Sequence, residues 1–342
     1  MIIVTDGYHD AHTAKTAICV LRYRPGEVVA VLDRELAGRT CQEVFRVGGS
    51  IPCVATLAEA HAANTLLIGI APPGGKIPPH WRPFLLEAIG RGMTIFSGLH
   101  DLLKNDAEFV LAAAASGARL VDLRENDEHD VNNRRGIRAE CLRIHTIGTD
   151  CSVGKMVAAV EVTDGLCRAG VDAQFVATGQ TGIIVAGGGC PIDRVIADFV
   201  AGAAEKLVLA NQHHEVIVIE GQGSLFHPRY SGVTLSLLHG SMPDGLVLGY
   251  EMGRRAIGDV NDFPLPTLEK AVEVYETMAN LMHPCRVIGV FVNGQHAQND
   301  DDVAAECERV ERRLGLPACD VIRHGPGKLV EAVWKMKIQR GT

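Results

Sequence analysis

Residues 141–156 read CLRIHTIGTDCSVGKM, and this stretch sets the architecture of the C-terminal half of the chain. Its second part, Gly148 to Met156, matches the P-loop pattern G-x-x-x-x-G-K between a strand-like and a helix-like run, the flanks that the motif requires. The glycines let successive backbone N–H groups curl around a phosphate, and Lys155 and the positive end of the helix add charge. The sequence therefore predicts a phosphate site that opens an α/β domain. The residues expected to contact the phosphates are Gly148, Thr149, Cys151, Ser152, Val153, Gly154, Lys155 and Met156.

Met156 stands where most P-loops have Ser or Thr, so the hydroxyl that holds Mg²⁺ in nucleotide hydrolases is missing. Ser152 or Thr149 could replace it, but the simpler interpretation is a loop that binds phosphate without hydrolysing a nucleotide. His9 with His12, and the adjacent histidines 213–214, come without a third ligand at the spacing of a metal site. We therefore expect no metal.

Short β-rich runs alternate with helical stretches along nearly the whole chain, which is typical of βαβ units and parallel sheets. The polar stretch 125–138 has no periodicity and is the best linker candidate. We predict an α/β protein of two domains, a Rossmann-like parallel sheet over 1–137 and a P-loop parallel sheet resembling dethiobiotin synthetase over 138–342. The expected strands are 28–33, 65–70, 93–96, 119–121, 142–147, 173–177, 216–220, 246–250 and 287–293. The expected helices are 13–23, 56–63, 79–91, 106–116, 155–169, 193–210, 268–282 and 301–314.

Glu220 ends the buried strand-like run VIVIE and precedes a Gly-rich turn, where the acidic residue of a P-loop protein's second motif lies. It could position a metal or a water, act as a general base, or merely cap the turn. Asp150 and His227 are further candidates for the base.

Other polar residues follow the neighbouring strands and are expected at the same crevice, because ligands bind outside the carboxyl ends of parallel strands. Arg229 could hold a carboxylate bidentately, and Asn293 ends a strand next to the site. The other candidate contacts are Gln180, Thr181 and Ser224. For each of these side chains, a structural hydrogen-bonding role is an open alternative.

The N-terminal half lacks the G-x-G-x-x-G pattern after its first strand, so NAD binding is not supported. Its strongest feature is the stretch 69–82, GIAPPGGKIPPHWR, which leaves a buried strand and enters a helix. The turn could hold an anion through Gly74, Gly75 and Lys76, with Arg82 and Lys15 nearby. The alternative is a rigid loop whose tryptophan covers the core.

The composition is that of an ordinary globular protein, with 342 residues, 47% of them hydrophobic, and a net charge of −8. No basic stripe points to nucleic acid, and no apolar run is long enough to span a bilayer. The first residues lack the features of a signal peptide, and the ten cysteines form no CxxC pair. We expect a cytoplasmic homo-oligomer with reduced thiols that acts on a small molecule and binds neither nucleic acid nor membrane.

The motifs GTDCSVGKM, VIEGQGSLFHP, LLIGIAPPGGKIPPHWR and SGLHDLL, with the AKTA…LRY start, resemble a bacterial and archaeal family over essentially the whole chain. That family pairs a Rossmann-like N-terminal half with a P-loop C-terminal half, and it was long carried as a domain of unknown function. It includes a D-glutamate N-acetyltransferase that uses acetyl-CoA and works with an epimerase-type enzyme in D-glutamate catabolism. Val157 replaces the Thr expected in relatives, a change that leaves the backbone role of the loop intact.

The resemblance implies acetyl transfer from acetyl-CoA to the amine of D-glutamate. In that hypothesis the P-loop anchors the coenzyme's phosphates, Glu220 is preferred as the base over His227 or Asp150, and basic side chains hold the carboxylates. The basic candidates are Lys15, Lys76, Arg82 and Arg229. Two alternatives are open: an ATP-dependent kinase or ligase resembling dethiobiotin synthetase, and a non-catalytic nucleotide- or CoA-binding regulator.

Overall fold

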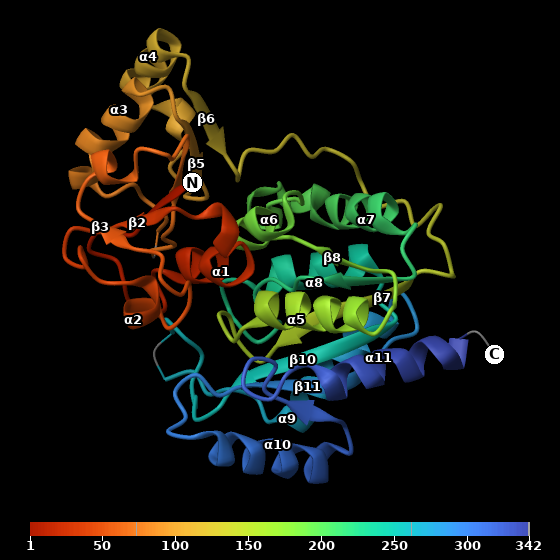
Figure 1. Cartoon of the computed structure of the whole chain (residues 1–342). Coiled ribbons are helices and arrows are strands. Elements are labelled where there is room, and N and C mark those ends of the chain that lie inside the picture. The colour runs from red at the N-terminus through yellow and green to blue at the C-terminus, as the bar shows by residue number, and fades with distance from the viewer. Residues whose placement is uncertain (73, 261, 341–342) are drawn as a thin grey trace. The chain divides into compact units, whose positions relative to one another are not determined.

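The N-terminal unit is a six-stranded, all-parallel sheet with the strand order β3-β2-β1-β4-β5-β6 (Figure 1). This is the order of a doubly wound Rossmann-like sheet, as the sequence predicted. Its strands are β1 (Ile2–Val4), β2 (Ala30–Leu32), β3 (Cys53–Val54), β4 (Thr65–Ile68), β5 (Thr94–Ser97) and β6 (Arg119–Asp122). Its helices are α1 (Lys15–Tyr23), α2 (Cys41–Phe45), α3 (Arg82–Gly90) and α4 (Ala107–Ser116).

Alternate residues of β1 belong to different cores, because successive side chains of a strand point to opposite faces of the sheet. Ile2 and Val4 pack with residues of α3 and α4, whereas Ile3 packs with residues of α1 and α2. Helices therefore cover both faces, and this is why the central strand is hydrophobic at every position.

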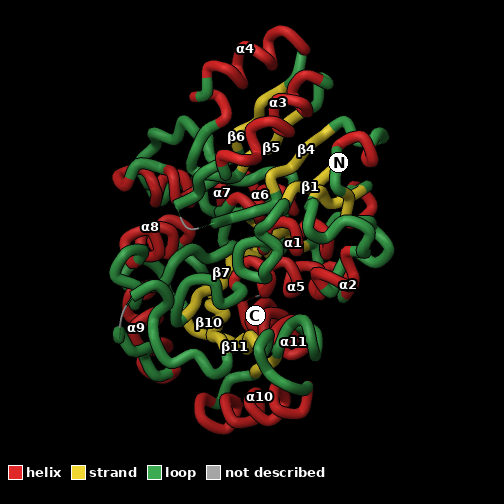
Figure 2. The backbone as a smooth tube through the Cα atoms, turned by 90° about the vertical axis from the view of Figure 1, so that its left-hand side faces the viewer, coloured by secondary structure: helices red, strands yellow, loops and turns green. Residues whose placement is uncertain are grey.

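The C-terminal unit is a second all-parallel sheet, with the order β12-β11-β10-β7-β9-β8. The tube of Figure 2 shows β7, β10 and β11 side by side. Its strands are β7 (Leu142–Gly148), β8 (Ala173–Val176), β9 (Val216–Ile219), β10 (Gly245–Glu251), β11 (Arg286–Asn293) and β12 (Ala318–Cys319). Its helices are α5 (Lys155–Arg168), α6 (Gln180–Ala186), α7 (Val200–Asn211), α8 (Ser231–Ser241), α9 (Leu268–Asn280), α10 (Asp300–Leu314) and α11 (Gly327–Arg340).

Strand β7 lies between β9 and β10, and the chain continues from it to β8 and β9 on one side and then to β10 on the other. Such a reversal opens a crevice at the carboxyl end of the central strand, where ligands bind in open α/β sheets. The P-loop follows β7, so the topology places it at that crevice.

The computed structural model describes residues 1–72, 74–260 and 262–340. One unit comprises Met1–Asn126 with Ile183–Gly187, and the other comprises Asp127–Gly182 with Gly188–Thr342. The division after Asn126 falls inside the predicted linker 125–138. The backbone N–H of Asn133 donates to Glu205 of α7, so part of this stretch packs on the C-terminal unit. The last two residues of the predicted domain 138–342 lie outside the described residues.

Several predicted helices differ from those observed. Two 3₁₀ turns, Ile192–Arg194 and Ala197–Phe199, precede α7, which begins at Val200, because Val195 and Ile196 between the turns adopt non-helical backbone angles. The predicted helix 56–63 is a 3₁₀ turn, Leu57–Ala60, closed by a capping box between Thr56 and Glu59. Helices α2, α6, α8 and α11 were not predicted. Helix α8 packs against both α7 and α9, so its sequence lacks the polar face that reveals a surface helix.

Within the described residues, no helix combines the length and the apolar character needed to cross a bilayer.

Candidate active site at the P-loop

The loop between β7 and α5 has the backbone shape of an anion cradle. Ser152 and Gly154 adopt left-handed angles, with φ of 56° and 104°, which turn the chain sharply before the helix begins at Lys155. Successive N–H groups in such a turn form a concavity that attracts anions. Val153 is buried beneath the loop, Ser152 is exposed, and Met156 is half-buried. The predicted P-loop therefore has the expected position and conformation.

Lys155 is the cation of the site, and only 7% of its surface is exposed. Its Nζ donates to the carbonyl oxygen of Asp150 at 2.8 Å, so the side chain lies back over the loop. Burial lowers the pKa of Lys155, while attraction to Cys151, Asp150 and Glu220 opposes that change. An anion bound in the loop would stabilise the charged ammonium.

Asp150 is fully buried and accepts hydrogen bonds from three directions. Arg254 Nη1 donates to its Oδ2 at 2.9 Å, the N–H of Gly258 donates to the same oxygen at 2.7 Å, and the N–H of Cys151 donates to Oδ1 at 2.6 Å. Arg254 also pairs with Glu251 at 2.6 Å. This carboxylate therefore fixes the loop, and its bonds leave it poorly placed as a base.

Arg254 and Glu251 were missed by the sequence analysis. Glu251 is the last residue of β10, the strand beside β7, and Arg254 follows three residues later. The rule that ligand residues follow the carboxyl ends of neighbouring strands could have found both.

Glu220 directly follows β9 and is buried, with 4% of its surface exposed. The N–H groups of Thr178 and Gly179 donate to its Oε2 at 2.9 and 3.1 Å, and Gln222 Nε2 donates to Oε1 at 3.2 Å. Burial raises the pKa of Glu220 from 4.5 to about 7, although these bonds and Lys155 act in the opposite direction. A carboxyl group that titrates near neutral pH is suited to general acid–base work.

Glycines shape the space around this carboxylate. A Cβ built on Gly179 would lie 3.1 Å from Glu220 Oε1, and one built on Gly182 would overlap Glu220 Oε2. A side chain at Gly182 would therefore fill the place that the carboxylate occupies, and one at Gly179 would overlap Nε2 of Gln222, which donates to that carboxylate.

Two predicted contact residues carry buried oxygens that have no hydrogen-bond partner among the described residues, namely Thr149 Oγ1 and Gln180 Oε1. Buried polar atoms are nearly always paired in folded proteins, and an exception calls for an explanation. Both residues lie at strand ends of the crevice, where a bound ligand can supply the missing partner.

Ser224 and Tyr275 hold the start of the loop. Ser224 Oγ donates to the carbonyl oxygen of Gly148 at 3.0 Å, and Tyr275 OH donates to the same oxygen at 2.8 Å. Asn293 ends β11, and its Nδ2 lies 3.7 Å from a Cβ built on Gly154. Ser224 therefore holds the backbone of the loop in place, and Asn293 lies beside the loop.

Residues 130–330 match the family described as "Domain of unknown function (DUF1611_C) P-loop domain", and residues 34–126 match its partner, the "DUF1611_N Rossmann-like domain". The chain belongs to the DUF1611 family.

Two curated relatives of this DUF1611 chain are named "D-glutamate N-acetyltransferase". The protein from Tritonibacter scottomollicae is 39% identical over 329 residues, which is 95% of each chain. The protein from a Pseudoalteromonas species is 37% identical over 279 residues, covering 81% of this chain and 83% of the relative. A crystal structure of a DUF1611 family protein from Anabaena variabilis is 33% identical, covers 98% of both chains and superposes with a TM-score of 0.90.

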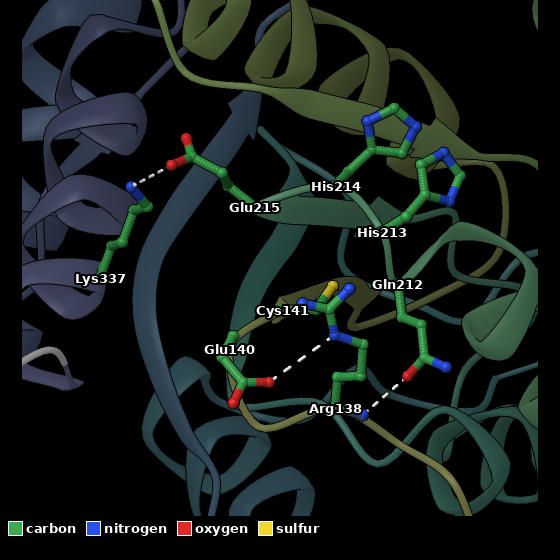
Figure 3. Close-up of a pocket in the computed structure, with 8 residues that line it drawn as sticks. All are labelled: Arg138, Glu140, Cys141, Gln212, His213, His214, Glu215 and Lys337. Carbon is green, nitrogen blue, oxygen red and sulfur yellow. Dashed lines mark hydrogen bonds and ion pairs between the residues drawn. The ribbon is translucent and has the colours of Figure 1, made fainter.

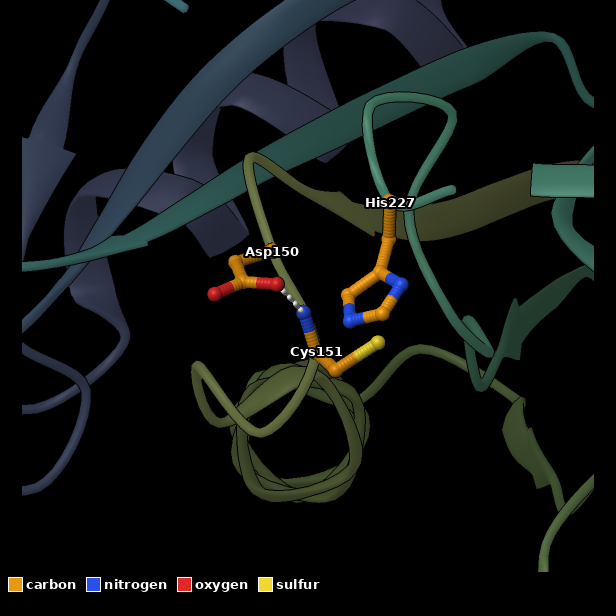
Figure 4. A group of neighbouring side chains, drawn as sticks. All are labelled: Asp150, Cys151 and His227. Carbon is orange, nitrogen blue, oxygen red and sulfur yellow. Dashed lines mark hydrogen bonds between the residues drawn. The ribbon is translucent and has the colours of Figure 1, made fainter. Parts of the chain in front are cut away.

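His227 of the DUF1611 chain is buried beside the P-loop, and both of its ring nitrogens are engaged. Its Nδ1 accepts from the N–H of Arg229 at 3.2 Å, so the ring proton lies on Nε2, which donates to the carbonyl oxygen of Gly258 at 3.2 Å. Figure 4 shows the ring directed toward the sulfur of Cys151. With this arrangement Nε2 is a donor, and the acceptor nitrogen Nδ1, the atom through which the ring would act as a base, faces the N–H of Arg229.

The other predicted contacts of the C-terminal unit lie at its surface or edge. Arg229 is exposed, and its Nη2 donates to the carbonyl oxygen of Asp259 at 2.8 Å. Thr181 is half-buried in the first turn of α6.

The remaining predicted residues of the DUF1611 chain belong to the N-terminal unit. The carbonyl oxygen of Gly75 accepts from the N–H groups of His100 and Asp101 at 2.8 and 3.1 Å, so the turn is tied to the loop after β5. Gly74 and Lys76 are exposed, and Lys15 begins α1. The tryptophan of this stretch is fully buried in the core, as the alternative interpretation expected.

Arg82 is already paired with two carboxylates. Its Nη1 and Nη2 bind Asp106 at 2.7 and 2.9 Å, its Nε binds Glu108 at 2.8 Å, and its guanidinium lies 4.6 Å from the ring centre of Phe109. These contacts join α3 to the start of α4. They give Arg82 a role in packing, and its bidentate fork is not available to a substrate.

The adjacent histidines 213–214 lie at the amino ends of the strands of the C-terminal sheet, opposite the P-loop, where they line a small cavity of about 180 Å³ (Figure 3). His214 Nδ1 pairs with Asp172 at 2.7 Å. The P-loop follows the carboxyl end of β7, whereas this cavity lies at the amino ends of β7 and β9, so the two sites are separate. The lining residues are Arg138, Glu140, Cys141, Gln212, His213, His214, Glu215 and Lys337.

Proposed function

We propose that this protein is an N-acetyltransferase that moves the acetyl group of acetyl-CoA to the amine of D-glutamate, in the breakdown of D-amino acids. Two relatives that carry the name D-glutamate N-acetyltransferase match 95% and 81% of the chain at 39% and 37% identity. The first of these matches spans 329 of the 342 residues, so it extends over both units.

The observation that carries the proposal is the buried carboxyl group of Glu220 in the same unit as an anion cradle. An amino acid presents an ammonium group that cannot attack a thioester until it loses a proton. Glu220 can accept that proton near neutral pH because burial raises its pKa to about 7. The charges of Glu220 and Lys155 interact across the site, so an anion at the loop would lie close to the base.

This proximity bears on which anion the loop binds. The pantetheine arm separates the phosphates of coenzyme A from its thioester by a long chain of bonds. Phosphates held at Lys155 would therefore keep the thioester away from Glu220. A carboxylate of D-glutamate is separated from its amine by only a few bonds, and it can also be held by backbone N–H groups and a lysine. We therefore assign the P-loop to a carboxylate of the amino acid, in place of the coenzyme phosphates that the sequence suggested.

The orphaned oxygens of Thr149 and Gln180 fit this assignment. Both are acceptors, and an ammonium group offers three N–H donors. Together with Glu220, they would give the amine end of the substrate a set of acceptors next to a cradle for its acid end.

One assay tests the proposed function. Purified protein is incubated with D-glutamate and either acetyl-CoA or ATP with Mg²⁺, and free thiol and ADP are measured. We expect thiol release that depends on D-glutamate, together with N-acetyl-D-glutamate identified by mass spectrometry. ADP release would instead support the ATP-dependent kinase or ligase. Ligand binding without any turnover would support the regulator, and either result would overturn the acetyltransferase.

A further inference from the structure

We propose that Cys151 carries the acetyl group as a thioester during the reaction, so that transfer proceeds in two steps through an acetyl-enzyme. This inference rests on the proposed function. It adds a nucleophile to the same site.

The position of Cys151 differs from that of the other cysteines. Eight of the ten cysteines are buried. Cys167 is exposed near the end of α5, whereas Cys151 is half-buried within the P-loop. A thiol needs both access to its substrate and a surrounding that favours the thiolate in order to react. Cys151 is the cysteine that is accessible within the candidate site.

Positive groups surround this residue. Arg254 Nη1 donates to the carbonyl oxygen of Cys151 at 3.0 Å, and the charge of Lys155 interacts with Cys151. Helix α5, of 14 residues, begins only four residues later, so its positive end also faces the loop. All three effects favour the thiolate, which is the nucleophilic form. The nearby carboxylate of Asp150 acts in the opposite direction, but it is itself paired with Arg254 at 2.9 Å.

The ring of His227 lies next to the sulfur of Cys151. Its ring and the sulfur of Cys151 face one another, and ligand atoms of Asp150, Cys151 and His227 all lie within 4.8 Å of one another (Figure 4). Because Nδ1 accepts a backbone N–H, the proton of the ring is on Nε2, which donates to the carbonyl oxygen of Gly258 at 3.2 Å. The ring is held in place by these two bonds, beside the sulfur.

The same three side chains could in principle ligate a metal ion, since Cys, His and Asp are common zinc ligands. Their contacts argue against it. The guanidinium of Arg254 pairs with Asp150 at 2.9 Å, Lys155 adds a second cation, and Nε2 of His227 donates to a carbonyl oxygen. The carboxylate of Asp150 and both ring nitrogens of His227 are thus already bonded to protein groups, which leaves them poorly placed to ligate an ion.

The chemistry balances in two steps. In the first, the thiolate of Cys151 attacks the carbonyl carbon of acetyl-CoA, a new S–C bond forms, and the bond to the coenzyme sulfur breaks. The coenzyme leaves as a thiolate that takes a proton from water. In the second step, the ammonium of D-glutamate gives one proton to Glu220, and the amine attacks the acetyl carbon. The amide forms, the second proton passes to water, and the Cys151 thiolate is released. Glu220 then gives its proton to water, which restores the base for the next turnover.

The test uses acetyl-CoA without any amino acid. Rapid mixing followed by mass spectrometry of the intact protein should show one added acetyl group, located by digestion on the peptide that contains Cys151, and a burst of thiol equal to the enzyme. In the full reaction, initial rates at several fixed D-glutamate concentrations should give parallel double-reciprocal lines.

Substitution of the sulfur separates a nucleophile from a packing residue. We expect Cys151→Ala and Cys151→Ser to lose both the burst and roughly a thousand-fold or more of the turnover. Both should keep the circular dichroism spectrum of the wild type. Cys167→Ala changes the exposed cysteine of the same unit and should keep the burst and the turnover.

Three results would overturn the inference while leaving the proposed function in place: a wild type that turns over without an acetylated intermediate, intersecting kinetic lines, or a Cys151→Ala variant of near-normal rate. Activity that a chelator abolishes and zinc restores would show instead that Cys151 is a metal ligand. A wild type that forms the acetyl-enzyme but does not acetylate D-glutamate would refute the amino-acid substrate and keep the nucleophile.

Discussion

The carboxylate of Glu220 occupies the space that a methyl group on Gly182 would fill, because a Cβ built there overlaps Glu220 Oε2. We therefore expect Gly182→Ala to displace the carboxylate and to destabilise the protein by about 1–3 kcal/mol, as overpacking does in a dense core. Gly188→Ala is the matched control, since nothing lies within 4 Å of its Cβ. Denaturant unfolding and turnover of both variants check this. Equal stability of the two would contradict the close packing at Gly182.

Glu220→Gln should lower kcat by about 100- to 10,000-fold, the range for loss of a general base. The KM for D-glutamate should rise less than kcat falls, because the amide keeps the size of the side chain and one acceptor oxygen for the ammonium.

The pH profile of the wild type gives an independent test of the same group. Burial raises the pKa of Glu220 to about 7, and the base acts only when it has lost its proton. The rate should therefore rise with pH up to about 7 and level off above it. Glu220→Gln should lack this limb. A limb that persists unchanged in Glu220→Gln would exclude Glu220 as the base.

Lys155→Ala distinguishes the two anions that the P-loop could bind. Loss of a charged hydrogen bond should raise the KM for D-glutamate by about tenfold to a hundredfold. The same rise is expected with acetyl-CoA and with S-acetyl-pantetheine, a donor without phosphates. If the variant were impaired with acetyl-CoA and normal with the truncated donor, the loop would bind the coenzyme's phosphates.

Arg254→Met should destabilise the protein by about 3 kcal/mol, because it leaves the fully buried carboxylate of Asp150 without its cation. Lys335→Met removes an exposed helical ion pair with Glu331 and should change the stability little. The free energy of unfolding of both variants provides the comparison. A small effect at Arg254 would mean that the backbone donors of Gly258 and Cys151 suffice for Asp150.

Arg82→Met tests the sequence-based assignment of Arg82 to the substrate. Since its guanidinium is paired with Asp106 and Glu108, we expect a modest loss of stability and an unchanged KM for D-glutamate. A large rise in KM with normal stability would restore Arg82 to the substrate site.

The sequence could predict the two sheets because their signals are local. A parallel strand that is buried on both faces shows as a short apolar run, and the P-loop shows as glycines and a lysine at fixed spacing. Glu220 could also be predicted from the sequence, because it directly follows a strand that shows as a local apolar run. Helix α8 was not, since a helix packed on several sides has no polar face to reveal its period.

The chemical state of the site depended on the tertiary structure. Arg254 and Asp150 are 104 residues apart, and no local pattern couples them. His227 and Cys151 meet only because β7 and β9 are neighbours in the sheet. Glu220 was visible as an acid, but its pKa near 7 follows from burial and from donors supplied by another strand end. The sequence by itself thus determined which groups were available, whereas desolvation and contacts between distant segments, which exist only in the folded chain, decided how those groups are charged and paired.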